Sequence, residues 1–224
     1  MAPAGNPHGD QPARYYGDPI GAAGRVAVVV HGRDQDPEWI REHLIARLDV
    51  PGTAYIAPAA AGGSWYPGRF FDPVEGNEPH LTWALERIHH LVEDLVAAGR
   101  DRGEIFLLGF SQGGCVVVEY VSRHGGRFGG VAALTAGLVG PSGTTWEGPS
   151  LTGLPVLLSV RDRDDWVPVG RVEETRAALV ARAADVRCWV YEGAGHGIID
   201  DEVRLVEKLL TRSDRRLART GRAL

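Results

Sequence analysis

Short apolar runs alternate with amphipathic segments along most of the chain. Uninterrupted apolar runs are typical of strands buried on both faces, and apolar residues spaced three or four apart are typical of helices. The runs predict strands at residues 25–30, 54–57, 105–108, 131–134, 156–160 and 187–191. The spaced pattern predicts helices over residues 36–48, 81–99, 116–121, 168–183 and 200–210.

The regular alternation of strands and helices decides the fold class. It implies right-handed crossovers and a mostly parallel central sheet with helices on both faces, which is an α/β fold. We expect one domain at residues 25–212, because 224 residues are within the usual size of a single α/β domain. A Pro- and Gly-rich N-terminal arm at 1–24 is expected to be flexible, and an Arg-rich basic tail at 213–224 is expected to be solvated or frayed, with an electrostatic docking segment as the alternative.

Two long stretches between the predicted elements are irregular and rich in Gly, Pro and Trp. They cover residues 59–78 and 137–153. Loops of this length in a compact domain usually line a binding or catalytic site. We therefore expect these two stretches to border the functional site.

Composition excludes several classes of protein. The formal net charge of −5 gives no reason to expect nucleic acid or an anionic membrane as a partner. The 2 cysteines, Cys115 and Cys188, form no C-x-x-C pair, so neither a disulfide scaffold nor a zinc site is expected. The first residues lack the apolar segment of a signal peptide, and no apolar run is long enough to span a bilayer. The expectation is a cytoplasmic enzyme without stable membrane insertion.

The strand predicted at 105–108 is followed by Gly109-Phe110-Ser111-Gln112-Gly113. In an open parallel sheet, ligands bind beyond the carboxyl ends of the strands, so residues at these ends are candidates for chemistry. A serine on a sharp strand-to-helix turn needs small residues two positions away on each side, and the two glycines meet that need. The turn exposes the hydroxyl at a helix N-terminus, where free N–H groups favour negative charge. Ser111 is therefore the candidate nucleophile.

Two other strand ends supply a candidate acid and a candidate base. Three aspartates follow the fifth predicted strand, and position alone does not choose among them: Asp162, Asp164 and Asp165. His196 follows the last predicted strand and stands between small residues, so its imidazole can approach the serine turn. A serine nucleophile needs such a base, and the base needs a carboxylate that orients it. The chain order Ser, Asp, His is the order expected in α/β-hydrolases.

His31-Gly32-Arg33 directly follows the first predicted strand. Acyl transfer needs N–H donors that point at the developing oxyanion. The expected donors are the backbone N–H groups of Arg33 and Gln112. His31 is interpreted as structural, with the role of a second base as the alternative.

These motifs resemble those of the phospholipase/carboxylesterase family, which includes the acyl-protein thioesterases. The resemblance rests on VVVHGR (28–33), GFSQGG (109–114), D-x-x-V-P (164–168) and YEGAGH (191–196), and extends over residues 26–210. It implies a compact α/β-hydrolase fold with little or no lid, and it implies that Asp164 is the triad carboxylate. The family usually has His-Gly-x-Gly after the first strand and His-Gly before the aspartate. In this chain, Asp34 replaces the second glycine of His-Gly-x-Gly, and Val160-Arg161 stands where the family has His-Gly before the aspartate.

The resemblance implies a serine hydrolase that cleaves carboxylic esters, like a carboxylesterase or lysophospholipase, through Ser111, Asp164, His196 and an acyl-enzyme. No metal or organic cofactor is expected. The expected partner is a small-molecule ester or thioester, and the chain is expected to be a monomer or a homodimer. Alternatives are a thioesterase, a lactone or dienelactone hydrolase, or an acyltransferase. From another class, the alternative is a catalytically silent binding module.

Aromatic residues near the predicted triad are candidates for the substrate pocket. They are Trp65, Tyr66, Phe70 and Trp166, with Phe71 beside them. The alternative is that these rings only pack their loops. The sequence leaves the natural substrate and its chain length open.

Overall fold

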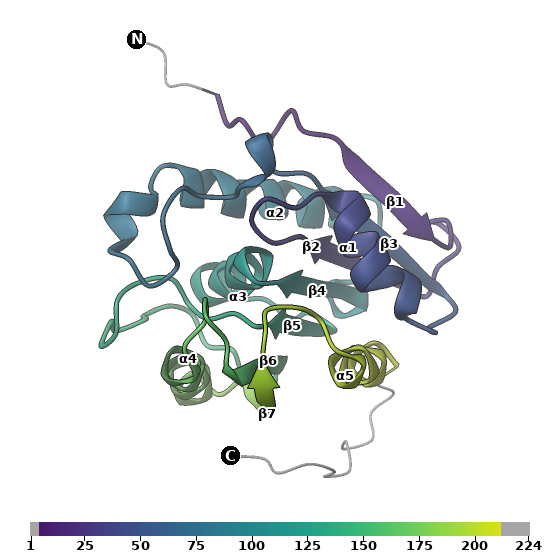
Figure 1. The fold of residues 1–224 in the computed structure, drawn as a ribbon. Helices are drawn as coiled ribbons and strands as arrows, with labels where there is room; N and C mark the ends of the chain where they lie inside the picture. The colour runs from purple at the N-terminus through teal and green to yellow at the C-terminus, as the bar shows by residue number, and fades with distance from the viewer. Residues whose placement is uncertain (1–4, 212–224) are drawn as a thin grey trace.

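The computed structural model describes residues 5–211, which form a seven-stranded sheet with helices on both faces (Figure 1). The strand order is β1-β3-β2-β4-β5-β6-β7, and all strands are parallel except β1, which runs antiparallel to β3 at one edge. The predicted α/β class and mostly parallel sheet are confirmed. The strands are β1 Ala13–Gly17, β2 Arg25–Val30, β3 Thr53–Pro58, β4 Ile105–Phe110, β5 Gly130–Leu134, β6 Pro155–Arg163 and β7 Asp185–Ala194. The helices are α1 Pro37–His43, α2 His80–Ala97, α3 Gln112–His124, α4 Val169–Ala181 and α5 Asp200–Leu210.

Alternate side chains of the strands face two separate apolar layers. In β2, Val26, Val28 and Val30 pack on the side of α2, α3 and α4, whereas Ala27 and Val29 pack on the side of α1 and α5. A strand covered on both faces must be apolar at every position, which is why β2 reads as an uninterrupted run. Figure 1 shows the two groups of helices on opposite sides of the sheet. None of the helices within residues 5–211 has the length and apolar character needed to cross a bilayer.

Within residues 5–24, which composition marked as part of a flexible arm, two features pack against the rest of the fold. Strand β1 extends the sheet at its edge. His8 is buried, and its ring donates from Nε2 to the carbonyl of Trp65 at 3.1 Å and accepts the N–H of Ala61 at Nδ1 at 3.0 Å. Composition alone does not indicate either feature. Strand β1 is too exposed to show an apolar run, and the second feature depends on the single polar ring of His8. The basic tail at 213–224 lies outside the described residues.

The helix predicted over residues 36–48 is interrupted. Asp36 caps its start as expected, with Oδ1 accepting the N–H of Trp39 at 2.8 Å. Helix α1 then ends at His43, because the next residue, Leu44, has a φ of −130°, which is not helical, and a separate 3₁₀ turn at Ile45–Arg47 follows. Both Leu44 and Ile45 are buried, so the apolar spacing persists through a bend that the pattern alone does not show.

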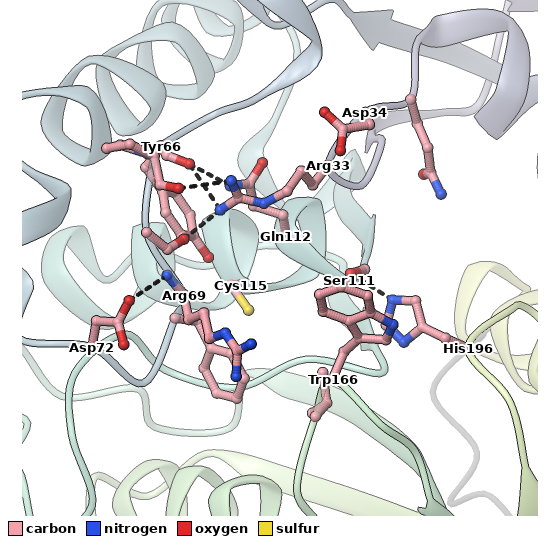
Figure 2. A pocket seen from close by; sticks show the side chains of 15 residues that line it. Arg33, Asp34, Tyr66, Arg69, Asp72, Ser111, Gln112, Cys115, Trp166 and His196 are labelled. Carbon is pink, nitrogen blue, oxygen red and sulfur yellow. Dashed lines mark hydrogen bonds between the residues drawn. The ribbon is translucent and has the colours of Figure 1, made fainter.

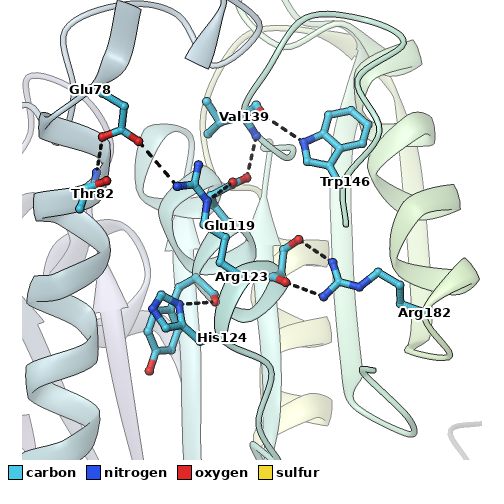
Figure 3. A network of polar contacts seen from close by, with 10 residues as sticks. Glu78, Thr82, Glu119, Arg123, His124, Val139, Trp146 and Arg182 are labelled. Atoms are coloured by element: carbon cyan, nitrogen blue, oxygen red, sulfur yellow. Dashed lines mark hydrogen bonds and ion pairs between the residues drawn. The ribbon is translucent and has the colours of Figure 1, made fainter. Parts of the chain in front are cut away.

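A buried carboxylate holds the second irregular stretch, residues 137–153 (Figure 3). Glu119 on α3 is 3% exposed, and it accepts the N–H of Val139 at 3.0 Å and the Nε–H of Arg123 at 2.7 Å. The N–H of Gly140 in turn donates to the carbonyl of Phe70 at 2.7 Å. A hydrogen bond from Gly140 therefore joins the stretch at 137–153 to the stretch at 59–78.

Candidate active site

Ser111 occupies the tight turn between β4 and α3. Its backbone has φ 52° and ψ −123°, a conformation that costs free energy in a residue with a side chain. A Cβ on Gly109 would lie 2.3 Å from the carbonyl oxygen of Gly113, and a Cβ on Gly113 would lie 2.2 Å from that of Val30. The N–H of Ser111 donates to the carbonyl of Leu134 at 2.9 Å, which ties the turn to β5. The turn thus has the crowded geometry for which the two glycines were predicted.

Three of the predicted residues meet in one chain of hydrogen bonds. The hydroxyl of Ser111 lies 2.8 Å from Nε2 of His196. Nδ1 of the same ring lies 2.9 Å from Oδ2 and 3.2 Å from Oδ1 of Asp164. The Asp164 side chain is 1% exposed, and its Oδ1 also accepts the N–H groups of Trp166 and Val167, each at 2.8 Å. These donors hold the carboxylate in one orientation, facing the imidazole.

The partners of the imidazole define its tautomer. A carboxylate only accepts hydrogen bonds, so Nδ1 of His196 carries the proton that faces Asp164. Nε2 is left unprotonated and accepts the hydroxyl of Ser111. A general base needs this arrangement, because its lone pair must point at the proton to be removed.

The two other aspartates at the end of β6 have different surroundings. Asp162 accepts the N–H of Gly193 at 2.9 Å and so fastens the loop that carries His196. Arg161 donates to the carbonyl of Ala194 in the same loop. Asp165 is exposed and, within residues 5–211, makes no hydrogen bond or ion pair. Among the three aspartates, only Asp164 contacts the histidine.

The turn after β2 places further N–H donors beside the serine. The backbone N–H groups of Arg33 and Gln112 have no hydrogen-bond acceptor among the described residues, and both residues line the pocket at Ser111. Asp34 takes φ 57°, a left-handed conformation that glycine adopts freely and that aspartate tolerates better than most residues. Its N–H donates to the carbonyl of Gly63 at 2.9 Å. Asp34 therefore accommodates a left-handed bend where the family usually has glycine.

His31 is buried beside this turn as a structural link. Its Nδ1 donates to the carbonyl of Gly32 at 2.7 Å, and its Nε2 accepts the N–H of Ala60 at 3.1 Å. Burial lowers the pKa of His31, which favours the neutral ring, the only form that can donate and accept at once. Burial likewise lowers the pKa of His8, which accepts the N–H of Ala61. Two neutral rings therefore hold the adjacent N–H groups of Ala60 and Ala61, in the stretch that leads to the pocket.

A pocket of about 510 Å³ opens beside Ser111 and His196 (Figure 2). Three of the predicted aromatic residues line it: Tyr66, Phe70 and Trp166. Trp65 does not line it, because its fully buried indole turns inward and donates from Nε1 to the carbonyl of His31 at 2.9 Å.

Other residues line the pocket that no motif indicated, among them Arg69, Asp72 and Cys115. Cys115 lies four residues after Ser111 on α3, and its N–H donates to the carbonyl of Ser111 at 3.0 Å. Residues four apart share one face of a helix. This spacing is the signal by which the sequence could have pointed to Cys115, whereas nothing comparable marks Arg69 or Asp72.

Comparison with known proteins decides the family. Residues 23–213 match the pattern of the family described as Phospholipase/Carboxylesterase. The chain belongs to this family. The resemblance inferred from the motifs is thereby confirmed, together with the α/β-hydrolase fold and an enzyme of the esterase type.

Three relatives illustrate the likeness to the phospholipase/carboxylesterase family. A crystal structure of a phospholipase/carboxylesterase from Dyadobacter fermentans has a TM-score of 0.82 and 33% sequence identity, and the match covers 91% of this chain and 97% of that one. Carboxylesterase SOBER1 of Arabidopsis thaliana is 26% identical over 66% of this chain and 67% of its own length. A probable inactive carboxylesterase of Oryza sativa is 26% identical over 76% of this chain and 74% of its own length.

Acidification is expected to weaken this esterase fold through His8 and His31. In the unfolded chain each ring binds a proton as the pH falls through its ordinary pKa of 6.5, whereas burial lowers both pKa values in the folded protein. The unfolded state therefore holds more protons below pH 6.5, and stability decreases by up to about 1.4 kcal/mol per pH unit for each ring. Urea titration at a series of pH values from about 7.5 down to about 5.5 measures this slope.

The variant His8→Gln removes one of the two rings and should flatten the slope. The matched control is His90→Gln, because the His90 side chain is exposed on α2 and makes no hydrogen bond or ion pair within the described range. The control should keep the wild-type slope. A wild-type slope in His8→Gln as well would show that His8 does not contribute to the pH dependence.

Proposed function

We propose that this chain is a serine esterase in which Ser111 is the nucleophile, His196 the general base and acid, and Asp164 the carboxylate that orients His196. The observation that carries the proposal is the continuous contact from the Ser111 hydroxyl through both ring nitrogens of His196 to Asp164. Membership of an esterase family and the pocket beside the serine support it.

The proposed reaction has two halves. His196 takes the proton of Ser111 as the hydroxyl oxygen attacks the ester carbonyl carbon. The N–H groups of Arg33 and Gln112 bind the resulting oxyanion, and losing one such donor typically costs about 10²–10³-fold in rate. As the tetrahedral intermediate collapses, His196 gives its proton to the departing alcohol and an acyl-enzyme remains. Water deprotonated by His196 then releases the acid and restores the serine hydroxyl.

The mechanism determines which side of the pocket receives each half of the ester. His196 must protonate the leaving alcohol, so the alcohol lies on the side of His196 and Trp166. The acyl group extends the other way, toward the part of the pocket lined by Cys115 and Tyr66 (Figure 2). Cys115 lies four residues beyond Ser111, which corresponds to about 6 Å along the helix axis.

Cys115 and Tyr66 close the acyl side of the pocket. Both are almost fully buried, and both line the pocket. Burial raises the pKa of the thiol to about 11, so Cys115 does not compete as a nucleophile. The remaining rim carries Arg69 and Asp72, whose charges are poor surroundings for a long alkyl chain. Esters of short acids are therefore the proposed substrates, in preference to long-chain lysophospholipids.

The alternatives to hydrolysis fit the site less well. Trp166 at the pocket rim is 59% exposed, so water reaches the acyl-enzyme and hydrolysis is favoured over acyl transfer. A silent binding module would need no intact triad. This chain retains both hydrogen bonds of His196, to Ser111 and to Asp164.

Ser111→Ala is expected to lower the hydrolysis of p-nitrophenyl acetate by at least about 10³-fold, because no other group can form the acyl-enzyme. A fluorophosphonate probe should label the wild-type protein at Ser111 and leave the variant unlabelled. Circular dichroism of the variant should match the wild type. Full activity in a folded Ser111→Ala protein would contradict the proposed function.

Asp164→Asn is expected to lower kcat by about 10⁴-fold, because an amide N–H facing Nδ1 selects the wrong tautomer of His196. Asp162→Asn is the matched control, since its amide oxygen can still accept the N–H of Gly193, and kcat should stay close to the wild-type value. Steady-state kinetics on the same ester compares the two. A larger loss in Asp162→Asn would mean that Asp164 is not the orienting acid.

Cys115→Ala should shift the preference toward longer acyl chains. The ratio of kcat/KM for p-nitrophenyl octanoate to that for the acetate should rise about 10-fold, since one methylene-sized group in a pocket contributes about 1–3 kcal/mol. Cys188→Ala is the matched control: it removes an equally buried sulfur from β7, outside the pocket lining, and should leave the ratio unchanged. Equal shifts in both variants would indicate general loosening instead of contact between Cys115 and the acyl chain.

A further inference from the structure

The two residues whose N–H groups face the oxyanion also hold one segment of the pocket wall with their side chains. This segment, the pocket loop, comprises residues 60–68. The guanidinium of Arg33 donates to three successive carbonyl oxygens of the pocket loop, those of Tyr66 at 3.0 Å, Pro67 at 2.7 Å and Gly68. No ion pair joins Arg33 to a carboxylate in the part of the chain that the structure describes. Its hydrogen bonds there are all to backbone.

Gln112 holds the same loop from the side of α3 (Figure 2). Its Oε1 accepts the N–H of Trp65 at 2.9 Å, and its Nε2 donates to the carbonyl of Tyr66 at 2.7 Å. The carbonyl oxygen of Tyr66 therefore accepts from both Arg33 and Gln112. This one atom links the two sides of the oxyanion hole.

The peptide group that carries the Arg33 N–H is held from its other end as well. The Arg33 N–H and the Gly32 carbonyl belong to the same planar group, and that carbonyl accepts Nδ1–H of His31 at 2.7 Å. The N–H of Gly32 donates to Oε1 of Gln35 at 2.8 Å. Gly32 lies against the nucleophile, since a Cβ there would be 3.2 Å from the Cβ of Ser111. A rotation of the Gly32–Arg33 peptide would therefore break the hydrogen bond from His31 to the Gly32 carbonyl and would turn the Arg33 N–H in another direction.

We propose that the Arg33 side chain is a positioning residue for the oxyanion hole. By tying its own residue to the pocket loop, it keeps the Arg33 backbone N–H aimed at the oxyanion before substrate binds, so no reorganisation is needed as charge develops. A guanidinium suits this task because its rigid fork offers five N–H donors, whereas the lysine ammonium is a compact point charge. The inference rests on the proposed esterase function, because the oxyanion exists only in that reaction.

The test replaces Arg33 by methionine, which keeps an unbranched side chain and removes all five donors. The kcat for p-nitrophenyl butyrate should fall about 10–100-fold, which is less than the loss of an oxyanion donor itself, with KM little changed. The affinity for a trifluoromethyl ketone, which forms a tetrahedral adduct with the serine, should fall by the same factor. Arg33→Lys should restore only a small part of both losses. Rates are expressed per active site counted by end-point labelling with the fluorophosphonate probe, so unfolded protein does not contribute.

Arg163→Met is the matched control. The Arg163 side chain is 70% exposed at the end of β6 and does not line the pocket, so this variant should keep the wild-type kcat and inhibitor affinity. An unchanged kcat per site in Arg33→Met, or a loss confined to KM, would overturn the positioning role. Failure of the esterase proposal is distinguishable, because it would appear as absent labelling of the wild-type protein or as activity in Ser111→Ala.

Discussion

A steric constraint at Gly113 determines the geometry of the whole site. A Cβ at this position would lie 2.2 Å from the carbonyl oxygen of Val30 and 2.4 Å from that of His31, so only glycine lets α3 begin so close to the end of β2. Because α3 begins there, Ser111 stands at the start of a helix and directly beside the turn that carries Arg33. Ser111 and the two proposed oxyanion donors, Arg33 and Gln112, are neighbours because the absence of a side chain at Gly113 lets the two backbones approach this closely.

The same region stores backbone strain in two residues. Ser111 and Asp34 both have positive φ, at 52° and 57°, and such conformations cost on the order of 1–3 kcal/mol each when a side chain is present. The surrounding hydrogen bonds hold them, from Ser111 to the carbonyl of Leu134 and from Asp34 to that of Gly63. Strained residues of this kind cluster at functional sites, where the rest of the fold over-determines their conformation. Here both residues line the pocket.

The pocket loop is attached through its backbone groups as well as through the buried side chains of Trp65 and Tyr66. Two neutral histidines, one carboxamide and one guanidinium form hydrogen bonds with N–H and carbonyl groups of residues 60–68. Buried polar groups are costly unless partnered, and this set of contacts partners them. Within residues 5–211, the backbone N–H groups of Arg33 and Gln112 have no acceptor, which is the condition an oxyanion hole requires.

The features that the sequence determined by itself depend on neighbours along the chain. Apolar runs identify strands that are covered on both faces, and glycines two residues from Ser111 identify the strand-to-helix turn. Ser111, Asp164 and His196 each follow a predicted strand, and the carboxyl ends of parallel strands lie at the same edge of a sheet, so the sequence places the three residues together. Choosing Asp164 over Asp162 took the family resemblance.

The tertiary structure decided what depends on residues far apart in the chain. Three hydrogen bonds show this. Trp65 bonds to His31, 34 positions away, His8 bonds to Trp65, 57 positions away, and Gln112 bonds to Tyr66, 46 positions away. No local pattern encodes such contacts, because the direction of a loop side chain is set by whichever backbone groups the fold brings beside it. For that reason the motif after β2 indicated an oxyanion donor at Arg33, whereas the attachment of its side chain to the pocket loop became visible only in three dimensions.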